Sequence, residues 1–302
     1  MIRSPRAAGL LFTTLTGLAC LVIVAMVTLI LGVVVGNGAG TISWAFLTRS
    51  PEAGMTEGGI FPAIFGTAAL VILMTIAVIP LGVATAVYLH EYAPKKSRLV
   101  ALVRLAIQNL AGVPAIVYGL FGLGFFIEFV GRGVDRIAFG GELTYGRPAI
   151  LWAALTLALL TLPTVVVSTE EALRAIPTVY REAAYALGAS RWQVLHRIIL
   201  PQAVSGILTG GILAVSRGSG EVAPVMFTGA AYFLPHLPMR LNDQFMELGY
   251  HVYVLTTQSP DVERTKPILY ATVGVLLSLT FALNFTAILI RARIRGRLRD
   301  GR

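Results

Sequence analysis

EEALRAIPTVYREAAYALGASRWQVLHRIILP, residues 170–201, is the longest clearly polar stretch that lies between two apolar blocks of this sequence. Pro177 suits the start of a helix, where its missing N–H costs nothing, and Gly188 suits the left-handed residue that ends one. Ser190 can cap a second helix, before Pro201 opens the following apolar segment. The stretch therefore predicts two short helices joined by a turn.

The first of these helices has a surface suited to close contact. Glu182, Ala183 and Ala184 place two small side chains beside one carboxylate, so the backbone of another protein can approach closely. We therefore expect a partner to hold this helix.

The composition of the chain is that of a membrane protein. Apolar residues make up 56% of it and charged residues 13%, whereas soluble domains have about 45–50% and about 25%. The single cysteine, Cys20, lies in the first apolar run, so no disulfide can form within one chain. These features predict one all-α domain that crosses a membrane several times, without a separate soluble module.

Six apolar runs approach or exceed the roughly 20 residues that span a bilayer. The first is too long for a signal-peptide core, and we expect it to be an uncleaved anchor. The third contains Pro114, which a span tolerates only where neighbouring helices satisfy the freed carbonyl, so this span should pack within protein. Residues 241–255, between the last two spans, predict a short amphipathic helix on the membrane surface. The six transmembrane helices are expected at about residues 10–35, 60–89, 99–126, 149–167, 204–221 and 267–290.

The basic residues indicate which side of the membrane each loop faces. With both termini in the cytoplasm, the inner pieces hold sixteen basic and five acidic residues, and the outer pieces hold seven and nine. Arg217 and Glu221, within or beside the fifth span, cancel each other and complete the net charge of +9. The stretch 170–201 is therefore predicted to lie in the cytoplasm. The basic residues placed inside are Arg3, Arg6, Lys95, Lys96, Arg98, Arg104, Arg174, Arg181, Arg191, Arg197, Arg291, Arg293, Arg295, Arg297, Arg299 and Arg302.

The spacing within the polar stretch resembles a known motif. From Glu182 it reads EAA, three residues, Gly188, nine residues, Ile198, one residue, then Leu200 and Pro201. This is similar to the EAA loop of ABC-importer membrane subunits, in which the loop forms a coupling helix that docks in a groove of a cytoplasmic ATPase. The residues to which the resemblance assigns ATPase coupling are Arg181, Glu182, Ala183, Ala184 and Gly188.

Three further segments resemble one branch of these importers. Residues 112–121 read GVPAIVYGLF, residues 168–173 read STEEAL, and residues 217–224 read RGSGEVAP. All three are similar to the A-type permease subunits of the bacterial phosphate importer. In that branch a threonine usually stands where this chain has Val222, which weakens any role for a hydroxyl group there.

The resemblance implies a fold and a set of partners. The fold is that of binding-protein-dependent (MetI-like) importer permeases, with six spans, a core at about residues 60–291 and a cytoplasmic coupling helix. The chain would form half of a pathway for inorganic phosphate in the bacterial inner membrane. Its partners would be a second, different permease subunit, two copies of an ATPase, an extracytoplasmic phosphate-binding protein and membrane lipid. ATP and Mg²⁺ are expected on the ATPase, because this chain has no Walker A sequence.

Arg217 and Glu221 are the candidate residues of the substrate pathway. Ionised groups at membrane depth are expensive and normally face the protein interior or a water-filled path. One interpretation is a buried ion pair that holds the fifth span. The other is that the planar donor fork of Arg217 offers bidentate hydrogen bonds to a passing phosphate, while Glu221 orients the arginine.

Other functions stay open at this point. A permease of the same fold could carry another oxyanion or a small solute. A distant alternative is an intramembrane enzyme that uses Arg217, Glu221 and Glu128, although the chain has no GxSxG or HExxH sequence. No catalytic residue or cofactor is expected on this chain. No metal ligand is expected either, because its histidines lack the spacing of a metal site. Its basic C-terminal tail suits anionic lipid, and no nucleic acid is expected.

Overall fold

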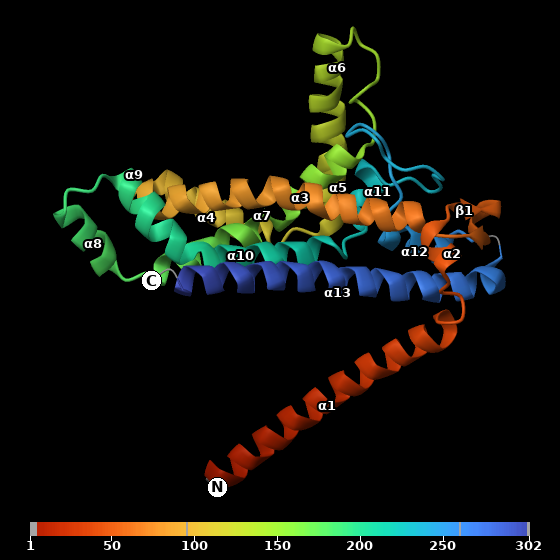
Figure 1. Ribbon diagram of the computed structural model, residues 1–302, viewed down its shortest axis with the longest axis horizontal. Helices are drawn as coiled ribbons and strands as arrows, with labels where there is room; N and C mark the ends of the chain where they lie inside the picture. Colours follow the sequence, from red (N-terminus) through yellow and green to blue (C-terminus); the bar gives the residue numbers. More distant parts are fainter. Residues whose placement is uncertain (1–4, 95, 260, 301–302) are drawn as a thin grey trace.

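The computed structural model describes residues 5–94, 96–259 and 261–300 (Figure 1). Arg3, Lys95 and Arg302, which the charge argument used, lie outside the described residues. The described chain is helical almost throughout, with one small antiparallel hairpin made of β1 (Pro51–Glu52) and β2 (Glu57–Gly58). The all-α prediction is confirmed.

Four long helices form the body of the molecule. α3 (Phe61–Val87), α7 (Ile150–Arg174) and α10 (Leu200–Gly218) pack on one another, and α13 (Val262–Asp300) lies along α10 (Figure 1). α1 (Pro5–Gly38) contacts α13 near its own C-terminal end and then diverges from the body. By length and composition, six helical stretches of the described chain are able to cross a membrane, namely Gly9–Gly38, Phe61–Tyr92, Ala115–Ala138, Ile150–Arg174, Arg191–Gly218 and Val262–Gly296.

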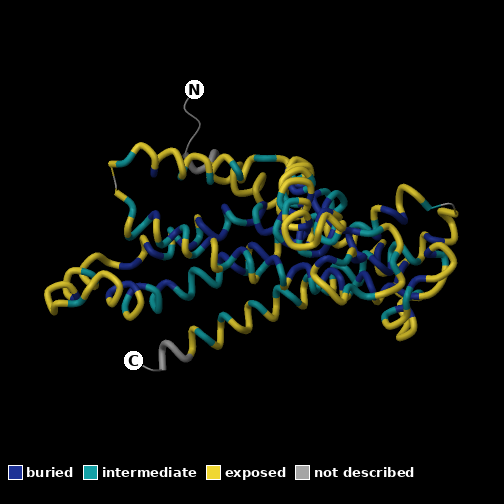
Figure 2. The backbone as a smooth tube through the Cα atoms, turned by 90° about the horizontal axis from the view of Figure 1, so that it is seen from above, coloured by how far each residue is buried: buried dark blue, intermediate teal, exposed yellow. Residues whose placement is uncertain are grey.

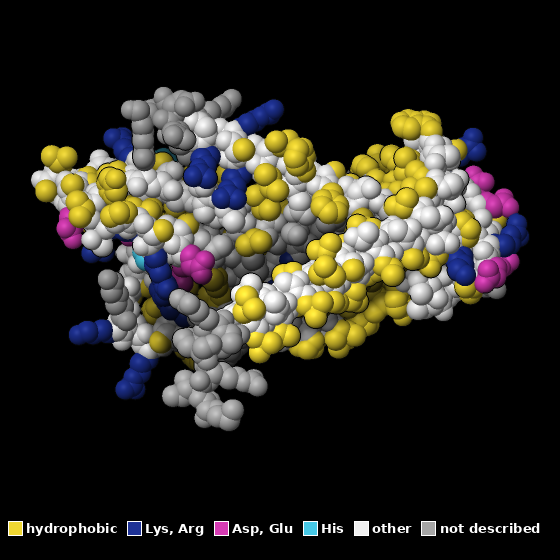
Figure 3. Space-filling model, turned by 90° about the horizontal axis from the view of Figure 1, so that it is seen from below, with side chains coloured by type: hydrophobic (Ala, Val, Ile, Leu, Met, Phe, Trp, Pro, Cys, Tyr) yellow, Lys and Arg dark blue, Asp and Glu magenta, His cyan; other side chains and the backbone are white. Residues whose placement is uncertain are grey.

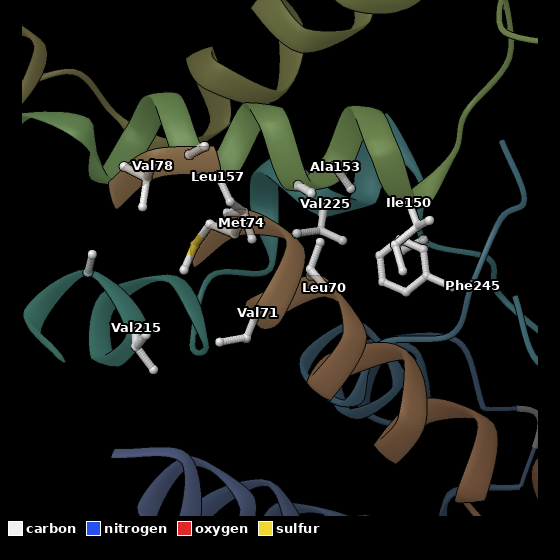
Figure 4. Packing of buried hydrophobic residues seen from close by; sticks show 14 of the residues in the cluster. Leu70, Val71, Met74, Val78, Ile150, Ala153, Leu157, Val215, Val225 and Phe245 are labelled. Atoms are coloured by element: carbon white, nitrogen blue, oxygen red, sulfur yellow. The ribbon is translucent and has the colours of Figure 1, made fainter. Parts of the chain in front are cut away.

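Apolar side chains from several helices fill the centre of the bundle (Figure 4). Leu70 and Met74 of α3 and Leu157 of α7 are all buried to 2% exposure or less. Phe245, which comes from the segment before α12, is fully buried beside Ile150 at the start of α7. Figure 2 shows the buried residues running along the inner helices of the bundle.

α10 lies close to α7 because small residues line the contact. An added Cβ at Gly206 would meet Ala172 of α7, and one at Gly210 would meet Ser168. This GxxxG spacing lets two helix backbones approach within a membrane. The close contact fixes the position of the whole of α10, including its last turn.

The expected third span at residues 99–126 is wrong in its bounds. α4 (Arg98–Leu110) is followed by four non-helical residues, 111–114. A second helical rod then consists of α5 (Ala115–Phe121), the π-helical η3 (Gly122–Gly131) and α6 (Arg132–Ala138). This rod runs across the direction of the bundle and projects from it (Figure 1). Pro114 causes the break, because its ring excludes a helical hydrogen bond and disfavours the α conformation in the residue before it.

One end of the bundle, here called the hairpin end, carries the β-hairpin and several short elements. They are α2 (Trp44–Thr48), the 3₁₀ turn η1 (Ala53–Met55), α11 (Ala223–Thr228) and α12 (Leu248–Thr257). The surface helix expected at residues 241–255 is wrong in start and placement, because α12 begins at Leu248 and packs against α13 and α3. Five of its residues are buried, namely Leu248, Gly249, His251, Val254 and Leu255.

The opposite end, here called the α8 end, contains the stretch 170–201. α8 (Thr178–Ala186) follows Pro177, Gly188 has φ +79°, and Ser190 forms a capping box with Gln193 at the start of α9 (Arg191–Val194). These three features confirm the predicted pair of short helices. The π-helical η4 (Leu195–Ile199) then continues into α10, so Pro201 lies within a continuous helix instead of starting one. A second π-helical turn, η2 (Tyr88–Tyr92), extends α3 at this end.

Candidate functional site

The exposed face of α8 carries large apolar and aromatic side chains. Val179 is 67% exposed, Tyr180 50% and Leu187 89%. α8 lies at the extreme of the α8 end, clear of the long helices (Figure 1). A helix that presents such residues outside the apolar body has the properties of a docking surface.

The two alanines beside Glu182 differ in their surroundings. Ala183 is exposed, whereas Ala184 is 6% exposed and packs against Leu173 and Val194. The expectation that both alanines are open to a partner therefore needs correction, because Ala184 anchors α8 to its own protein. Glu182, Ala183 and Gly188 remain exposed, and their assignment to ATPase coupling stays a prediction.

Arg181 points inward as well. Its guanidinium Nη2 lies 2.8 Å from Oε1 of Glu91 in η2 and donates to the carbonyl oxygen of Leu173 at 3.1 Å. Its Nη1 donates to the carbonyl oxygen of Ile176 at 3.0 Å. The side chain is 14% exposed, so its polar groups are used within the chain.

The candidate pathway residues lie where α10 stops. α10 ends at Gly218, roughly midway along α13 (Figure 1), so Glu221 is not on the same helix as Arg217. The Arg217 Nε to Glu221 Oε1 distance is 4.0 Å, with side-chain exposures of 37% and 25%. Their spacing of four residues therefore does not place them on one helix face, because α10 ends at Gly218 and the backbone turns before Glu221. The open, loosely paired guanidinium at the C-terminal end of a helix keeps donors available for another anion.

The structure brings two of the motif segments together at this point. Gly119 of α5 lies against the backbone of Ala223 and Pro224 at the start of α11, so any larger residue there would collide. The hydroxyl of Tyr118 donates to the carbonyl oxygen of Leu110 at 2.7 Å. The contact of α5 with the start of α11 was not predicted, although both belong to segments that the sequence marked.

A buried acid at the hairpin end was missed as well. Both carboxylate oxygens of Glu247 accept backbone N–H groups at the start of α12, from Gly249 at 2.7 Å and Tyr250 at 2.6 Å. Burial raises the pKa of Glu247 to about 7, against the lowering effect of these hydrogen bonds. Burial also lowers the pKa of His251, one turn later, to about 4, so this imidazole is neutral at pH 7. Gly249 packs against Val222, which places this acid beside the α10–α11 turn.

The described residues contain no group of three or more His, Cys, Asp or Glu side chains arranged to hold a metal ion. Glu128, the third ionisable group of the enzyme alternative, pairs with Arg132 on its own helical rod, with an Oε2 to Nε distance of 2.9 Å. Both side chains are nearly half exposed, so this pair has the geometry of a surface ion pair.

A family model described as "Binding-protein-dependent transport system inner membrane component" matches residues 78–299. The chain belongs to this family. The permease is therefore a membrane component of a transport system and not itself an enzyme. Its six apolar helices agree with a multi-pass protein of the inner membrane.

Curated relatives refine the comparison. The permease is 32% identical over 267 residues to YqgI of Bacillus subtilis, a probable ABC transporter permease protein, covering 84% of this chain and 85% of that one. It is 35% identical over 225 residues to the phosphate transport system permease protein PstA of Haemophilus influenzae, covering 74% and 73%. It is 36% identical over 210 residues to PstA of Mycobacterium leprae, covering 68% of this chain and 64% of that one.

Solved structures share the fold at low sequence identity. The permease superposes on a chain of a bacterial ABC transporter that imports the acidic polysaccharide alginate with a TM-score of 0.67 and 16% identity, covering 96% of this chain and 97% of that one. A chain of the MetNI methionine ABC transporter in an inward-facing conformation gives a TM-score of 0.58 at 18% identity, covering 77% and 94%. The permease therefore has the MetI-type ABC permease fold.

Proposed function

We propose that the permease forms half of the pathway for inorganic phosphate in an ATP-driven importer. The observation that carries this proposal is the meeting of residues 112–121 with the α10–α11 turn, where Arg217 is partly exposed and only loosely paired. The phosphate permeases named above, which are 35% and 36% identical to this chain, support phosphate as the substrate.

The chemistry of Arg217 suits this role. Its guanidinium can give two parallel hydrogen bonds to a phosphate, whereas the 4.0 Å contact with Glu221 is too long for a strong ion pair. Glu221 then orients the guanidinium and, by its own charge, keeps an anion from binding so tightly that it cannot leave. The break after Gly218 opens the backbone beside this position, as broken helices do in other transporters.

The partners follow from the same proposal. α8 docks on an ATPase through its exposed face, and ATP and Mg²⁺ bind to that ATPase. One permease chain supplies one α8, so a second, different permease and a second ATPase copy complete the complex. An extracytoplasmic binding protein delivers phosphate to the hairpin end.

The orientation of the permease is part of the proposal. Both termini and α8 lie in the cytoplasm, because basic residues are retained on that side. Figure 3 supports this arrangement, since Lys and Arg side chains gather at the α8 end while the hairpin end mixes acidic and basic side chains. Basic residues near the end of α13, such as Arg291 and Arg295, would then meet anionic lipid.

Reconstitution tests the proposal directly. The complex of permease, partner subunits and binding protein, placed in liposomes, should take up phosphate when ATP is supplied, and should take up sulfate and molybdate far more slowly. Faster uptake of either competing oxyanion would reject phosphate as the substrate and favour the other-oxyanion alternative.

Arg217→Lys tests the pathway residue. A lysine keeps the charge but loses bidentate recognition, so uptake should fall by about tenfold or more, as a loss of about 1.4 kcal/mol of binding would produce. The same substitution at Arg132, which pairs with Glu128, is the matched control and should leave uptake unchanged. Parental uptake by Arg217→Lys would remove Arg217 from the pathway.

A further inference from the structure

η2, the last turn of α3, is tied to two neighbouring elements by arginines. Arg181 of α8 contacts Oε1 of Glu91 at 2.8 Å, and Arg104 of α4 donates to the carbonyl oxygen of Leu89 at 2.7 Å. Both Arg181 and Glu91 are less than one-fifth exposed. A pair with so little water access is costly to break from one side, because the remaining charge stays unpaired.

Arg181 is also fixed at its own end. Its remaining hydrogen bonds go to the carbonyl oxygens of Leu173 and Ile176, the groups that link the end of α7 to the start of α8. The guanidinium therefore joins three segments, namely the end of α7, the base of α8 and η2. Because all these contacts act on one planar group, α8 cannot shift along its axis without moving Glu91 or breaking the pair.

α3 carries this connection into the bundle. The sulfur of Met74, about five turns before Glu91, lies against Gly218, the residue next to Arg217. Met74 is fully buried, and α3 packs along its length on α7 and α10. A displacement of η2 therefore reaches the end of α10 through packed atoms.

We propose that Arg181 and Glu91 form a rigid strut through which a movement of α8 displaces α3 and, with it, the α10 terminus that bears Arg217. Arg181 is a positioning residue that faces into its own chain and does not dock on the ATPase. This inference rests on the proposed function, because it assumes that an ATPase moves α8. π-helical turns such as η2 occur often at functional positions in helices, which agrees with a mechanical role here.

Removal of either charge provides the test. Glu91→Gln and Arg181→Gln should leave ATP hydrolysis in the complex measurable, while the phosphate transported per ATP hydrolysed falls about tenfold, within the roughly 5–150-fold range of coupling between sites. Arg132→Gln is the matched control, because Arg132 is 48% exposed and pairs with Glu128 on its own helical rod. An unchanged ratio in both single variants would overturn the strut.

A crosslink between positions 91 and 181 distinguishes a strut that stays closed from a contact that opens during transport. Cys20 is the one cysteine of the chain, so Cys20→Ser provides a background for Arg181→Cys with Glu91→Cys, joined by a short bifunctional thiol reagent. A strut predicts that the joined complex transports at a ratio close to that of Cys20→Ser. Hydrolysis without transport after joining would show that the two residues separate in the cycle and would overturn the inference.

The parental complex distinguishes this failure from failure of the proposed function. A parental complex that moves sulfate and not phosphate rejects the proposed substrate, and the ratio is then measured with sulfate. If the parental complex transports phosphate and both single variants have the same ratio of phosphate transported to ATP hydrolysed, only the strut is rejected.

Discussion

Gly188 offers a test of the α8 loop in which steric collision plays no part. Its φ of +79° lies in the left-handed region, and an added Cβ would meet nothing within 4 Å. Gly188→Val therefore perturbs only the backbone preference, at a cost of about 1–2 kcal/mol for an L-residue forced into this region. Gly188→Asn is the matched control, because asparagine visits the same region much more readily.

The strain has a measurable effect on ATPase binding. If the free loop relaxes and the ATPase requires the left-handed turn, the binding step must restore the strained conformation. A cost of about 1–2 kcal/mol then weakens the affinity by a factor of about 5–30. Titration of the purified ATPase onto permease in nanodiscs should show this loss for Gly188→Val and a much smaller one for Gly188→Asn. Parental affinity for the valine variant, or equal losses for both, would refute the argument that the turn conformation matters for docking.

Three further predictions concern other regions of the permease. Ala183→Trp should abolish ATPase binding and leave the thermal stability of the permease unchanged. Ala184→Trp should lower the stability by about 1–3 kcal/mol, because its site is packed. The opposite pattern would mean that Ala184 contacts the ATPase and Ala183 packs within the permease. Phe245→Ala should cost about 3–5 kcal/mol of stability, because the ring is fully buried, while Phe281→Ala on the exposed face of α13 should cost far less; equal melting temperatures would contradict the packing. The pKa of Glu247 is raised from 4.5 to about 7 by burial, so its contribution to stability is complete below about pH 4.5 and is lost as pH rises through 7. Between pH 5 and 8 the melting temperature of Glu247→Gln should therefore fall less than that of the parental permease. If the melting temperatures of both proteins fall equally with pH, burial of a titrating Glu247 is rejected.

Local rules were enough to predict the α8 end. Pro177, Gly188 and Ser190 each act within a few residues of chain, and the structure has a helix start, a left-handed turn and a capping box at those positions. The inward turn of Arg181 was not predictable in the same way. Its partner Glu91 lies ninety residues earlier in the chain, and only the tertiary fold brings the two side chains together.

The third span shows where composition misleads. Residues 99–126 are apolar enough to read as one helix, yet Pro114 divides them and the second rod takes a different direction. The sequence contained the signal in Pro114, but the direction of α5 depends on its packing against α11, which is a tertiary property. Glu247 was missed for a related reason. Its sequence neighbours do not distinguish it from the exposed acids, because its segment is held by residues distant in the chain. Thr67 accepts the N–H of Leu248, and Val222 lies against Gly249.

α3 links all the regions that matter for the proposed transport. Glu91 meets Arg181 at the α8 end, Met74 meets Gly218 in the middle, and the hydroxyl of Thr67 accepts the backbone N–H of Leu248 at the hairpin end. Pro80 interrupts the hydrogen bonding of α3 between the first two contacts and would act as a hinge in an isolated helix.

The packing around Pro80 opposes such bending. Ile79 of α3 lies against Gly211 of α10, and Gly82 lies against Val165 of α7, so close-packed neighbours hold the chain on both sides of the proline. A push on Glu91 must therefore move the neighbouring parts of α7 and α10 together with α3, because bending at Pro80 would separate these contacts. The end of α10, which bears Arg217, then shifts as part of a three-helix unit.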